Sequence, residues 1–202
     1  MAKIVKFPAP TKLGLKRARS DRPKKGKHSA DQLSLFDGVD VLEYPIVEVS
    51  SFERALLLDE EDDPKAAELY RKAISEGECV ADAYCNIGVM ESMKGRHARS
   101  IDSFTKALRE DSRHYESHYN LGNLYFEAGD LSLAQLHYEV TSEINPDFPN
   151  AYFNLGLVHA ISESYLPAMD SLMRYRELVP GDEGSQAEDL LRQLKQSIVS
   201  QG

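Results

Sequence analysis

The chain has 202 residues, of which 42% are hydrophobic and 28% charged, and its formal net charge at pH 7 is −9. These proportions are typical of one soluble domain, and no apolar run approaches the length of about 18 residues that a membrane-spanning helix requires. The two cysteines, Cys79 and Cys85, are too few for a disulfide framework. The amino terminus lacks the apolar core of a secretion signal, so we expect a cytoplasmic protein.

Charge is divided unevenly along the chain. Residues 1–30 contain ten Lys or Arg and one acid, a net charge of +9, whereas the other 172 residues contain fourteen against thirty-two, a net charge of −18. Residues 1–49 are predicted to form a disordered basic arm and linker, because the basic run has few apolar groups to bury. Such an arm could improve solubility, fold back onto the acidic remainder, or contact nucleic acid. The candidate nucleic-acid contacts are Lys16, Arg17, Arg19, Arg22, Lys24, Lys25 and Lys27.

A short motif follows the basic run and consists of Gln32, Leu33, Ser34, Leu35 and Phe36. It resembles, residue for residue, the peptide by which many bacterial replication and repair proteins dock on the DNA sliding clamp. The resemblance implies that the last two side chains enter an apolar pocket of a clamp while the glutamine amide makes polar contacts. In the alternative interpretation, the apolar residues of this motif pack against the first helix of the following domain as an ordered linker.

Residues 39–49 are rich in β-branched side chains, but Pro45 bars them from a central strand. We therefore expect this segment to pack along the helical domain, at one end or in its groove. In that position it would oppose partner binding, and deleting residues 1–49 should raise partner affinity.

From about residue 50 the chain is periodic. Three Asn-x-Gly triplets begin at Asn86, Asn120 and Asn154, spaced by 34 residues. That period is the length of one helix-turn-helix unit in a stacked array, in which each unit needs a neighbour to bury its apolar face. Aromatic, small and large apolar residues keep the same register four residues before and twelve and sixteen residues after each glycine: Tyr84, His118 and Tyr152; Ser100, Ala134 and Ala168; Phe104, Tyr138 and Leu172.

This pattern resembles the tetratricopeptide repeat family over residues 50–199. The resemblance implies an all-α, right-handed superhelical solenoid with a degenerate repeat near residues 50–79, repeats near 81–114, 115–148 and 149–182, and a capping helix near 183–199. The sequence departs from the family pattern at a few positions, where Glu91 and His159 replace an aromatic residue and Thr141 and Tyr175 replace a small one.

Breakers and periodicity place the individual helices. Residues 51–60 and 64–76 form a first pair, the second helix entered through Asp63 and Pro64. The next helices are expected near 81–93, 97–109, 115–127, 131–143, 149–161 and 165–178, with Gly95 and Gly129 in two of the turns. The last helix is expected near 182–199. Its apolar stripe would be Leu190, Leu191, Leu194 and Ile198.

The triplet glycines, Gly88, Gly122 and Gly156, should lie where the two helices of a repeat approach most closely. A glycine inside a helix costs about 1 kcal/mol relative to alanine, so close packing must offset that cost. The sequence therefore assigns these glycines to the fold.

The first helix of each repeat lines the concave face in this family. An asparagine there can both donate to and accept from the backbone of a bound peptide, whatever the peptide's side chains. The resemblance implies such an asparagine ladder at Asn86, Asn120 and Asn154. In the alternative interpretation, each asparagine bonds a neighbouring helix. The remaining candidate groove residues are Asn123, Tyr119, Phe153, Asp82, Glu116 and Asn150.

These groove positions include no Lys or Arg, which family members need to grip the carboxylate of a chaperone tail. Asp82 and Glu116 instead favour a basic or neutral peptide segment of a partner protein. We therefore predict an adaptor or scaffold that binds another protein. The alternative is a bacterial replication, repair or regulatory factor that reaches the sliding clamp through residues 32–36.

Enzymatic function is not expected. His114 and His118 are spaced for one helix face, but no third metal ligand accompanies them, and the acids of residues 59–63 lack a calcium-loop spacing. No phosphate-binding glycine loop or nucleophile motif is present. The sequence therefore predicts no catalytic residue, no metal site, no cofactor and no small-molecule substrate.

Overall fold

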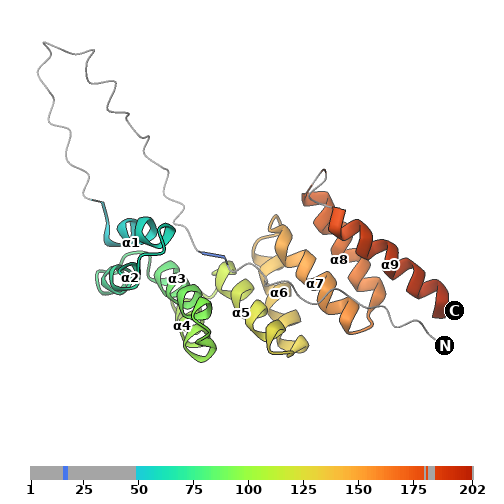
Figure 1. Cartoon of the computed structure of the whole chain (residues 1–202), viewed down its shortest axis with the longest axis horizontal. Coiled ribbons are helices and arrows are strands. Elements are labelled where there is room, and N and C mark those ends of the chain that lie inside the picture. Colours follow the sequence, from blue (N-terminus) through green and yellow to red (C-terminus); the bar gives the residue numbers. More distant parts are fainter. Residues whose placement is uncertain (1–15, 18–48, 180, 182–184, 202) are drawn as a thin grey trace, which may run out of the picture. The chain divides into compact units, whose positions relative to one another are not determined.

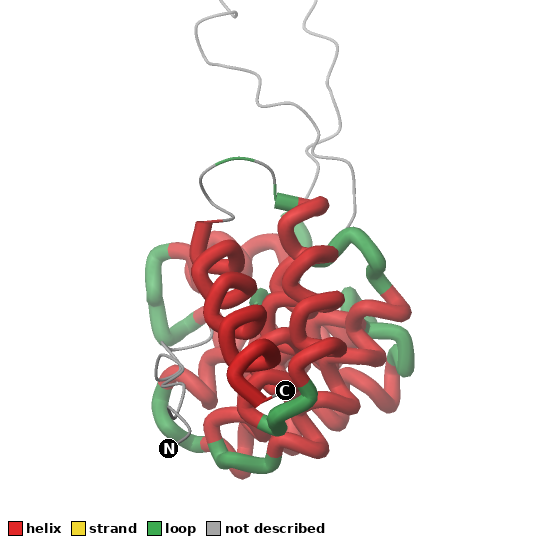
Figure 2. The backbone as a smooth tube through the Cα atoms, turned by 90° about the vertical axis from the view of Figure 1, so that its right-hand side faces the viewer, coloured by secondary structure: helices red, strands yellow, loops and turns green. Residues whose placement is uncertain are grey.

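A computed structural model describes residues 16–17, 49–179, 181 and 185–201 of the chain. Regular structure within these ranges is entirely α-helical, which confirms the predicted fold class (Figure 2). Each helix in the described ranges is too short or too polar to cross a bilayer. The described residues form two compact units, one containing α1 and α2 and the other containing residues 16–17 with α3 to α9.

The first unit is a helical hairpin of α1 (Ser51–Glu60) and α2 (Ala66–Ser75). Helix α1 begins with a capping box, because Ser50 Oγ accepts from the Glu53 N–H at 3.1 Å and Glu53 Oε2 accepts from the Ser50 N–H at 3.0 Å. Tyr70 joins the two helices, since its hydroxyl donates to the buried carboxylate of Asp59 at 3.1 Å.

The start of α2 differs from the predicted one. The helix begins at Ala66, two residues after Pro64, and its N-cap residue Lys65 has no side-chain cap. The Asp63 carboxylate accepts instead from the Lys65 N–H at 2.9 Å, within the turn. Asp63, the predicted cap, therefore stabilises the turn before α2 and does not cap the helix.

The second unit contains three antiparallel helix pairs in the predicted register (Figure 1). The bounds lie within one residue of the predicted ones. The pairs are α3 (Val80–Met93) with α4 (His97–Glu110), α5 (Tyr115–Glu127) with α6 (Leu131–Ile144), and α7 (Pro149–Ile161) with α8 (Tyr165–Leu178).

The triplet glycines lie at close contacts within these pairs, as predicted. A Cβ at Gly88 would be 2.6 Å from Phe104 Cε1, and one at Gly122 would be 2.6 Å from Tyr138 Cε1. At Gly156 the corresponding distance, to Leu172 Cγ, is 2.7 Å. Each glycine therefore leaves the space that the large residue sixteen positions later fills.

Left-handed backbone conformations end the first helix of each pair. Gly95 has φ +70° and Gly129 has φ +81°, and 34 residues later the same turn uses Glu163 with φ +57°. The Ser164 N–H donates to the His159 carbonyl at 2.8 Å, which closes this turn in the manner of a Schellman motif. The third turn therefore adopts its conformation without the glycine that the others use.

Helix α9 (Ser185–Gln201) closes the second unit. Leu190, Leu191 and Leu194 are buried in its core as predicted, together with Ala187. Ile198 was predicted to extend this stripe, but 36% of it remains exposed. The buried face of α9 continues instead at Ser197, which is 5% exposed.

The first prediction concerns the helix contact at Gly88. Alanine at this position should destabilise the fold by about 1–3 kcal/mol, because the new Cβ meets the Phe104 ring. The clash should outweigh the gain of about 1 kcal/mol in helix propensity. Urea unfolding measures this free energy, and combining Gly88→Ala with Phe104→Leu should cost less than the sum of the two single changes. A more stable Gly88→Ala protein would contradict the packing argument.

The second prediction concerns the turn at Glu163. Glu163→Gly should stabilise the fold by about 1 kcal/mol, because a non-glycine residue in the left-handed region costs about that much. Thermal unfolding at neutral pH measures the change. The matched control is Gly129→Glu at the equivalent turn, which should lower stability by a similar amount. A loss of stability in Glu163→Gly would show that the side chain compensates for its backbone.

Candidate functional site

The asparagines of the repeat register lie on α3, α5 and α7, the first helices of the three pairs. Each is buried, with exposed fractions of 0% for Asn86 and Asn120 and 2% for Asn154. All three take the same place on their helices, but the hydrogen-bond partners of Asn120 and Asn154 differ.

Asn120 holds the backbone of Lys16, a residue 104 positions away in the sequence. The Lys16 N–H donates to Asn120 Oδ1 at 2.9 Å, and Asn120 Nδ2 donates to the Lys16 carbonyl at 2.7 Å. Both polar groups of one peptide residue are thus satisfied by one carboxamide. This geometry is what a ladder rung requires, because it depends on the bound backbone and not on its side chain.

The side chains of the same segment contact residues on either side of α5. Lys16 Nζ lies 6.0 Å from the centroid of the Phe148 ring, just before α7. Arg17 Nη2 donates to the Met93 sulfur, at the end of α3, at 3.7 Å. The segment therefore runs from the α7 side towards the α3 side, against the order of the repeats.

Asn154 uses its carboxamide within the helical unit. Its Nδ2 donates to Asn123 Oδ1 at 3.1 Å and to the Tyr119 hydroxyl at 3.4 Å, both on α5. Asn123 Oδ1 also accepts from the Tyr138 hydroxyl at 2.8 Å. These contacts match the alternative interpretation, in which an asparagine bonds a neighbouring helix. Nδ2 of Asn123 is a buried donor for which the described residues supply no acceptor.

The preceding repeat explains why Asn120 and Asn154 differ. In the 34-residue register, α3 carries Cys85 and Val89 where α5 carries Tyr119 and Asn123. The Cys85 sulfur lies 3.6 Å from Asn120 Nδ2 and is a weak acceptor. Valine has no polar side-chain atom. Asn120 therefore lacks the strong internal partners that bind Asn154, and its carboxamide is used on Lys16.

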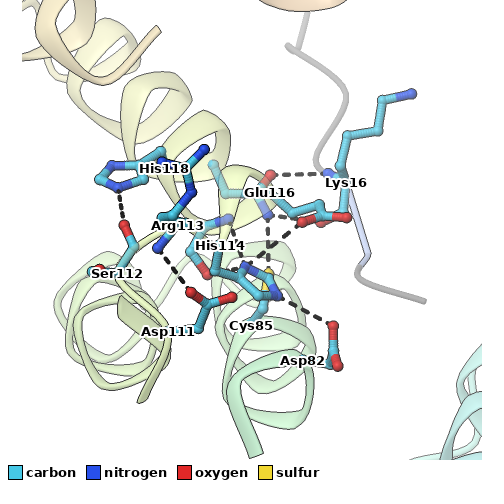
Figure 3. Close-up of polar contacts among 11 residues, drawn as sticks. Lys16, Asp82, Cys85, Asp111, Ser112, Arg113, His114, Glu116 and His118 are labelled. Carbon is cyan, nitrogen blue, oxygen red and sulfur yellow. Dashed lines mark hydrogen bonds and ion pairs between the residues drawn. The ribbon is translucent and has the colours of Figure 1, made fainter. Parts of the chain in front are cut away.

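Two acids that were predicted to face the groove flank a buried histidine (Figure 3). His114 Nε2 lies 3.2 Å from Asp82 Oδ1, and its Nδ1 lies 3.7 Å from Glu116 Oε2. Nδ1 also accepts from the Ser117 N–H at 3.2 Å and so caps α5. Burial alone would lower the pKa of His114, but the hydrogen bond to Asp82 and the nearby negative charges outweigh it and raise this pKa. Burial raises the pKa of Glu116.

The sequence did not single out His114 for this role. Its position directly before the first residue of α5 was the available signal, since a helix needs an acceptor there. The cluster holds Asp82 and Glu116 around His114 at the start of α5. Cys85 is buried next to them, and burial raises the pKa of its thiol to about 12, so the thiol stays protonated and unreactive.

The remaining predicted site residues are groove residues within the described ranges and arm residues outside them. Phe153 and Asn150 are partly buried on α7, and the Phe153 ring packs on Tyr175 of α8 with centroids 5.1 Å apart. The clamp-like motif, Gln32 to Phe36, lies outside the described residues. The same holds for Arg19, Arg22, Lys24, Lys25 and Lys27, so these candidates stay predictions.

A second histidine site lies on α5 and α6. His118 Nδ1 and His137 Nδ1 are 3.1 Å apart, and Tyr125 stacks on His137 with an interplanar angle of 7°. Burial and the neighbouring His118 lower the pKa of His137 to about 4. Burial also lowers the pKa of His118. Within the described ranges, no group of three or more His, Cys, Asp or Glu side chains could hold a metal ion.

Known family models match part of the region that contains the helix pairs. Two family models match the chain, one described as TPR repeat over residues 122–160 and the other as tetratricopeptide repeat over residues 93–140. Among solved structures, the first TPR of Spaghetti (RPAP3) bound to the HSP90 peptide SRMEEVD is similar, with TM-score 0.55 and 21% identity. That match covers 59% of this chain and 93% of the other. A crystal structure of MamA has TM-score 0.56 and 18% identity, covering 73% and 95%. At these identities the likenesses establish the fold alone.

Relatives with curated descriptions are similar over shorter stretches. Anaphase-promoting complex subunit 3 of Schizosaccharomyces pombe is 32% identical over 88 residues, which cover 44% of this chain and 13% of the relative. Photosystem I assembly protein Ycf3 of Acaryochloris marina is 26% identical over 78 residues, which cover 37% of this chain and 47% of the relative. The chain therefore matches less than half the length of either protein.

The third prediction concerns acid stability. His137 has a folded pKa of about 4, whereas an unfolded histidine titrates near pH 6.5. Between these values the unfolded chain binds more protons, so His137 should lower the free energy of unfolding as the pH falls from about 6.5. His114 has a raised pKa and acts in the opposite sense, contributing stability that is lost as the pH rises through its folded pKa.

Urea unfolding between pH 7 and pH 5.5 tests this, with His137→Gln expected to flatten the acid-side loss. NMR titration of the individual imidazole rings separates His137 from His114. A His137 ring that titrates near pH 6.5 in the folded protein would contradict the assigned burial.

Proposed function

We propose that this chain, a tetratricopeptide repeat protein, is an adaptor that binds an extended segment of a partner protein beside Asn120 on the first helices of its repeats. The observation that supports this function is the pair of hydrogen bonds between the Asn120 carboxamide and the backbone of Lys16. A carboxamide that already holds the backbone N–H and C=O of one residue can hold those of another chain in the same way. The function is therefore recognition of a polypeptide.

Charge supports a basic or neutral ligand. Asp82 and Glu116 flank His114, and the side chain of Glu116 is only 14% exposed. Both charges also act on Cys85, whose sulfur lies 3.6 Å from Asn120 Nδ2. An incoming acidic segment would be repelled by these carboxylates, whereas Lys or Arg side chains would be attracted. The HSP90 peptide SRMEEVD, bound by the similar RPAP3 domain, carries two consecutive glutamates and an aspartate. We therefore expect a different class of ligand for this chain.

The buried Nδ2 of Asn123 supports a contact longer than one residue. It lies one helical turn from Asn120 and has no acceptor among the described residues. Buried donors in proteins are usually paired, so a carbonyl of a bound chain is a suitable acceptor. The ligand would then span more than one turn of α5.

The alternative function, recruitment to a sliding clamp through Gln32 to Phe36, has no supporting contact in the described residues. It remains a prediction from the motif alone. Lys16 and Arg17 were also predicted to contact nucleic acid, and their described contacts are with α5, Phe148 and Met93.

The fourth prediction tests the proposed function by peptide display. Random twelve-residue peptides selected on the full chain should be enriched in internal Lys and Arg. Asn120→Ala should weaken the selected peptides by about tenfold or more, because two backbone hydrogen bonds are lost and each contributes about 1 kcal/mol. Fluorescence anisotropy measures these affinities.

The matched control is Asn154→Ala, the same substitution at the same register position. It should lower thermal stability, because Tyr119 and Asn123 lose a hydrogen-bond partner, while affinity below the melting temperature stays within a few-fold of the parent. Because Asn120→Ala also releases Lys16, the decisive comparison is made with Lys16→Pro in both proteins: if Asn120→Ala then folds normally and binds the selected peptides as tightly as the protein that keeps Asn120, the proposed groove is wrong.

A further inference from the structure

We infer that the segment around Lys16 and Arg17 is a resident ligand of this protein's own groove, which a partner must displace before it can bind. This inference rests on the proposed function and adds its regulation and the chemistry of its ligand. It is carried by contacts between the described part of the arm and helices that follow it by about a hundred residues.

The first step is competition for the same atoms. Lys16 occupies Asn120 Oδ1 through its N–H and Asn120 Nδ2 through its carbonyl. A second backbone needs both of these atoms, and at 2.9 Å and 2.7 Å the existing bonds have ordinary full-strength lengths. The resident segment and a partner segment therefore exclude each other at Asn120.

The second step is the chemistry of the resident segment. Lys16 is placed over the Phe148 ring, which packs edge-on against Tyr119 with centroids 5.0 Å apart. Arg17 reaches the Met93 sulfur. An ammonium over an aromatic face and a guanidinium on a polarisable sulfur are sites that suit basic side chains. The groove thus favours a Lys-Arg pair in an extended segment. The pair lies inside a chain, so a free terminus is not needed for binding.

The third step is the covalent tether. Residues 18–50 separate the resident segment from α1, and 33 residues span up to roughly 110 Å when fully extended. A tethered ligand competes at an effective concentration that can reach the millimolar range. The arm also has the opposite charge to the rest of the chain, +9 in residues 1–30 against −18 in the remainder. A weak contact at Asn120 is therefore sufficient to oppose a partner.

The test measures binding of one labelled peptide, with the sequence of residues 11–22, to full-length proteins. In the parent chain the resident segment should compete with the probe. Lys16→Pro removes the N–H that donates to Asn120 and leaves every residue of the helices unchanged. The probe should bind Lys16→Pro about tenfold tighter than the parent, the change expected for loss of one good hydrogen bond.

Two controls separate the backbone from the side chain. Lys16→Ala removes the same charge but keeps the N–H, so its affinity for the probe should stay closer to that of the parent. A probe with an N-methyl group on its own Lys16 keeps every side chain but loses the donor, and it should bind Lys16→Pro at least tenfold more weakly than the unmodified probe. The Asn120 side-chain amide signals in a 15N NMR spectrum should shift between the parent and Lys16→Pro.

Several outcomes would overturn the inference while leaving the proposed function intact. Equal probe affinity for the parent and Lys16→Pro, with weakening by Asn120→Ala in both, would show that the resident segment does not compete. If Lys16→Ala and Lys16→Pro raise the affinity for the probe by the same factor, the Lys16 N–H is not what holds the resident segment at Asn120. Competition that disappears on dilution of the parent would place the segment in the groove of a second copy. No probe binding to Lys16→Pro would also overturn it, since the freed groove should accept its own segment. By contrast, if adding Asn120→Ala to Lys16→Pro, in which the resident segment no longer competes, leaves probe affinity unchanged, the proposed function itself is wrong.

Discussion

The missing side chain of one glycine in each repeat sets the distance between paired helices, and the remaining geometry of the second unit follows from that distance. At Gly88, Gly122 and Gly156 the space that a Cβ would take is filled by a large side chain from the facing helix. Ser100 strengthens one of these contacts by donating to the Gly88 carbonyl at 2.7 Å. Because the same contact recurs every 34 residues, the first helices keep one register, and residues two positions before each glycine take equivalent places on α3, α5 and α7.

Most of the helical architecture could be predicted because it depends on residues that are close in sequence. Glycine, proline and the apolar period placed the helices of the three pairs to within one residue. Two predictions failed where a local signal had another partner. Asp63 bonds the Lys65 N–H in the loop and does not begin α2. Ile198 continues the apolar spacing of α9, but the buried face of that helix passes through Ser197, which is 5% exposed.

The candidate site was predictable only in part, for a physical reason. The register singled out asparagines at equivalent positions, but it could not rank them. Their roles depend on the preceding repeat, where Tyr119 and Asn123 engage Asn154 while Cys85 offers Asn120 only a sulfur. The segment bound to Asn120 lies 104 residues away and outside the periodic region, so no spacing rule relates the two. Segment 39–49, expected to pack on the helices, lies outside the described residues apart from Val49.

The contact between Lys16 and Asn120 also has a thermodynamic consequence that works in both directions. If occupation of Asn120 by the arm weakens a groove ligand by some factor, linkage requires that the groove ligand weaken the arm's hold by the same factor. A second molecule that binds the residues around Lys16 would therefore raise the affinity of the groove for its ligand. The groove ligand would raise the affinity of Lys16 and its neighbours for that second molecule by the same factor. The two binding surfaces differ chemically, because one is a basic segment of chain and the other is an acidic face of helices. Two unrelated partners could thus promote each other's binding through this chain without ever touching.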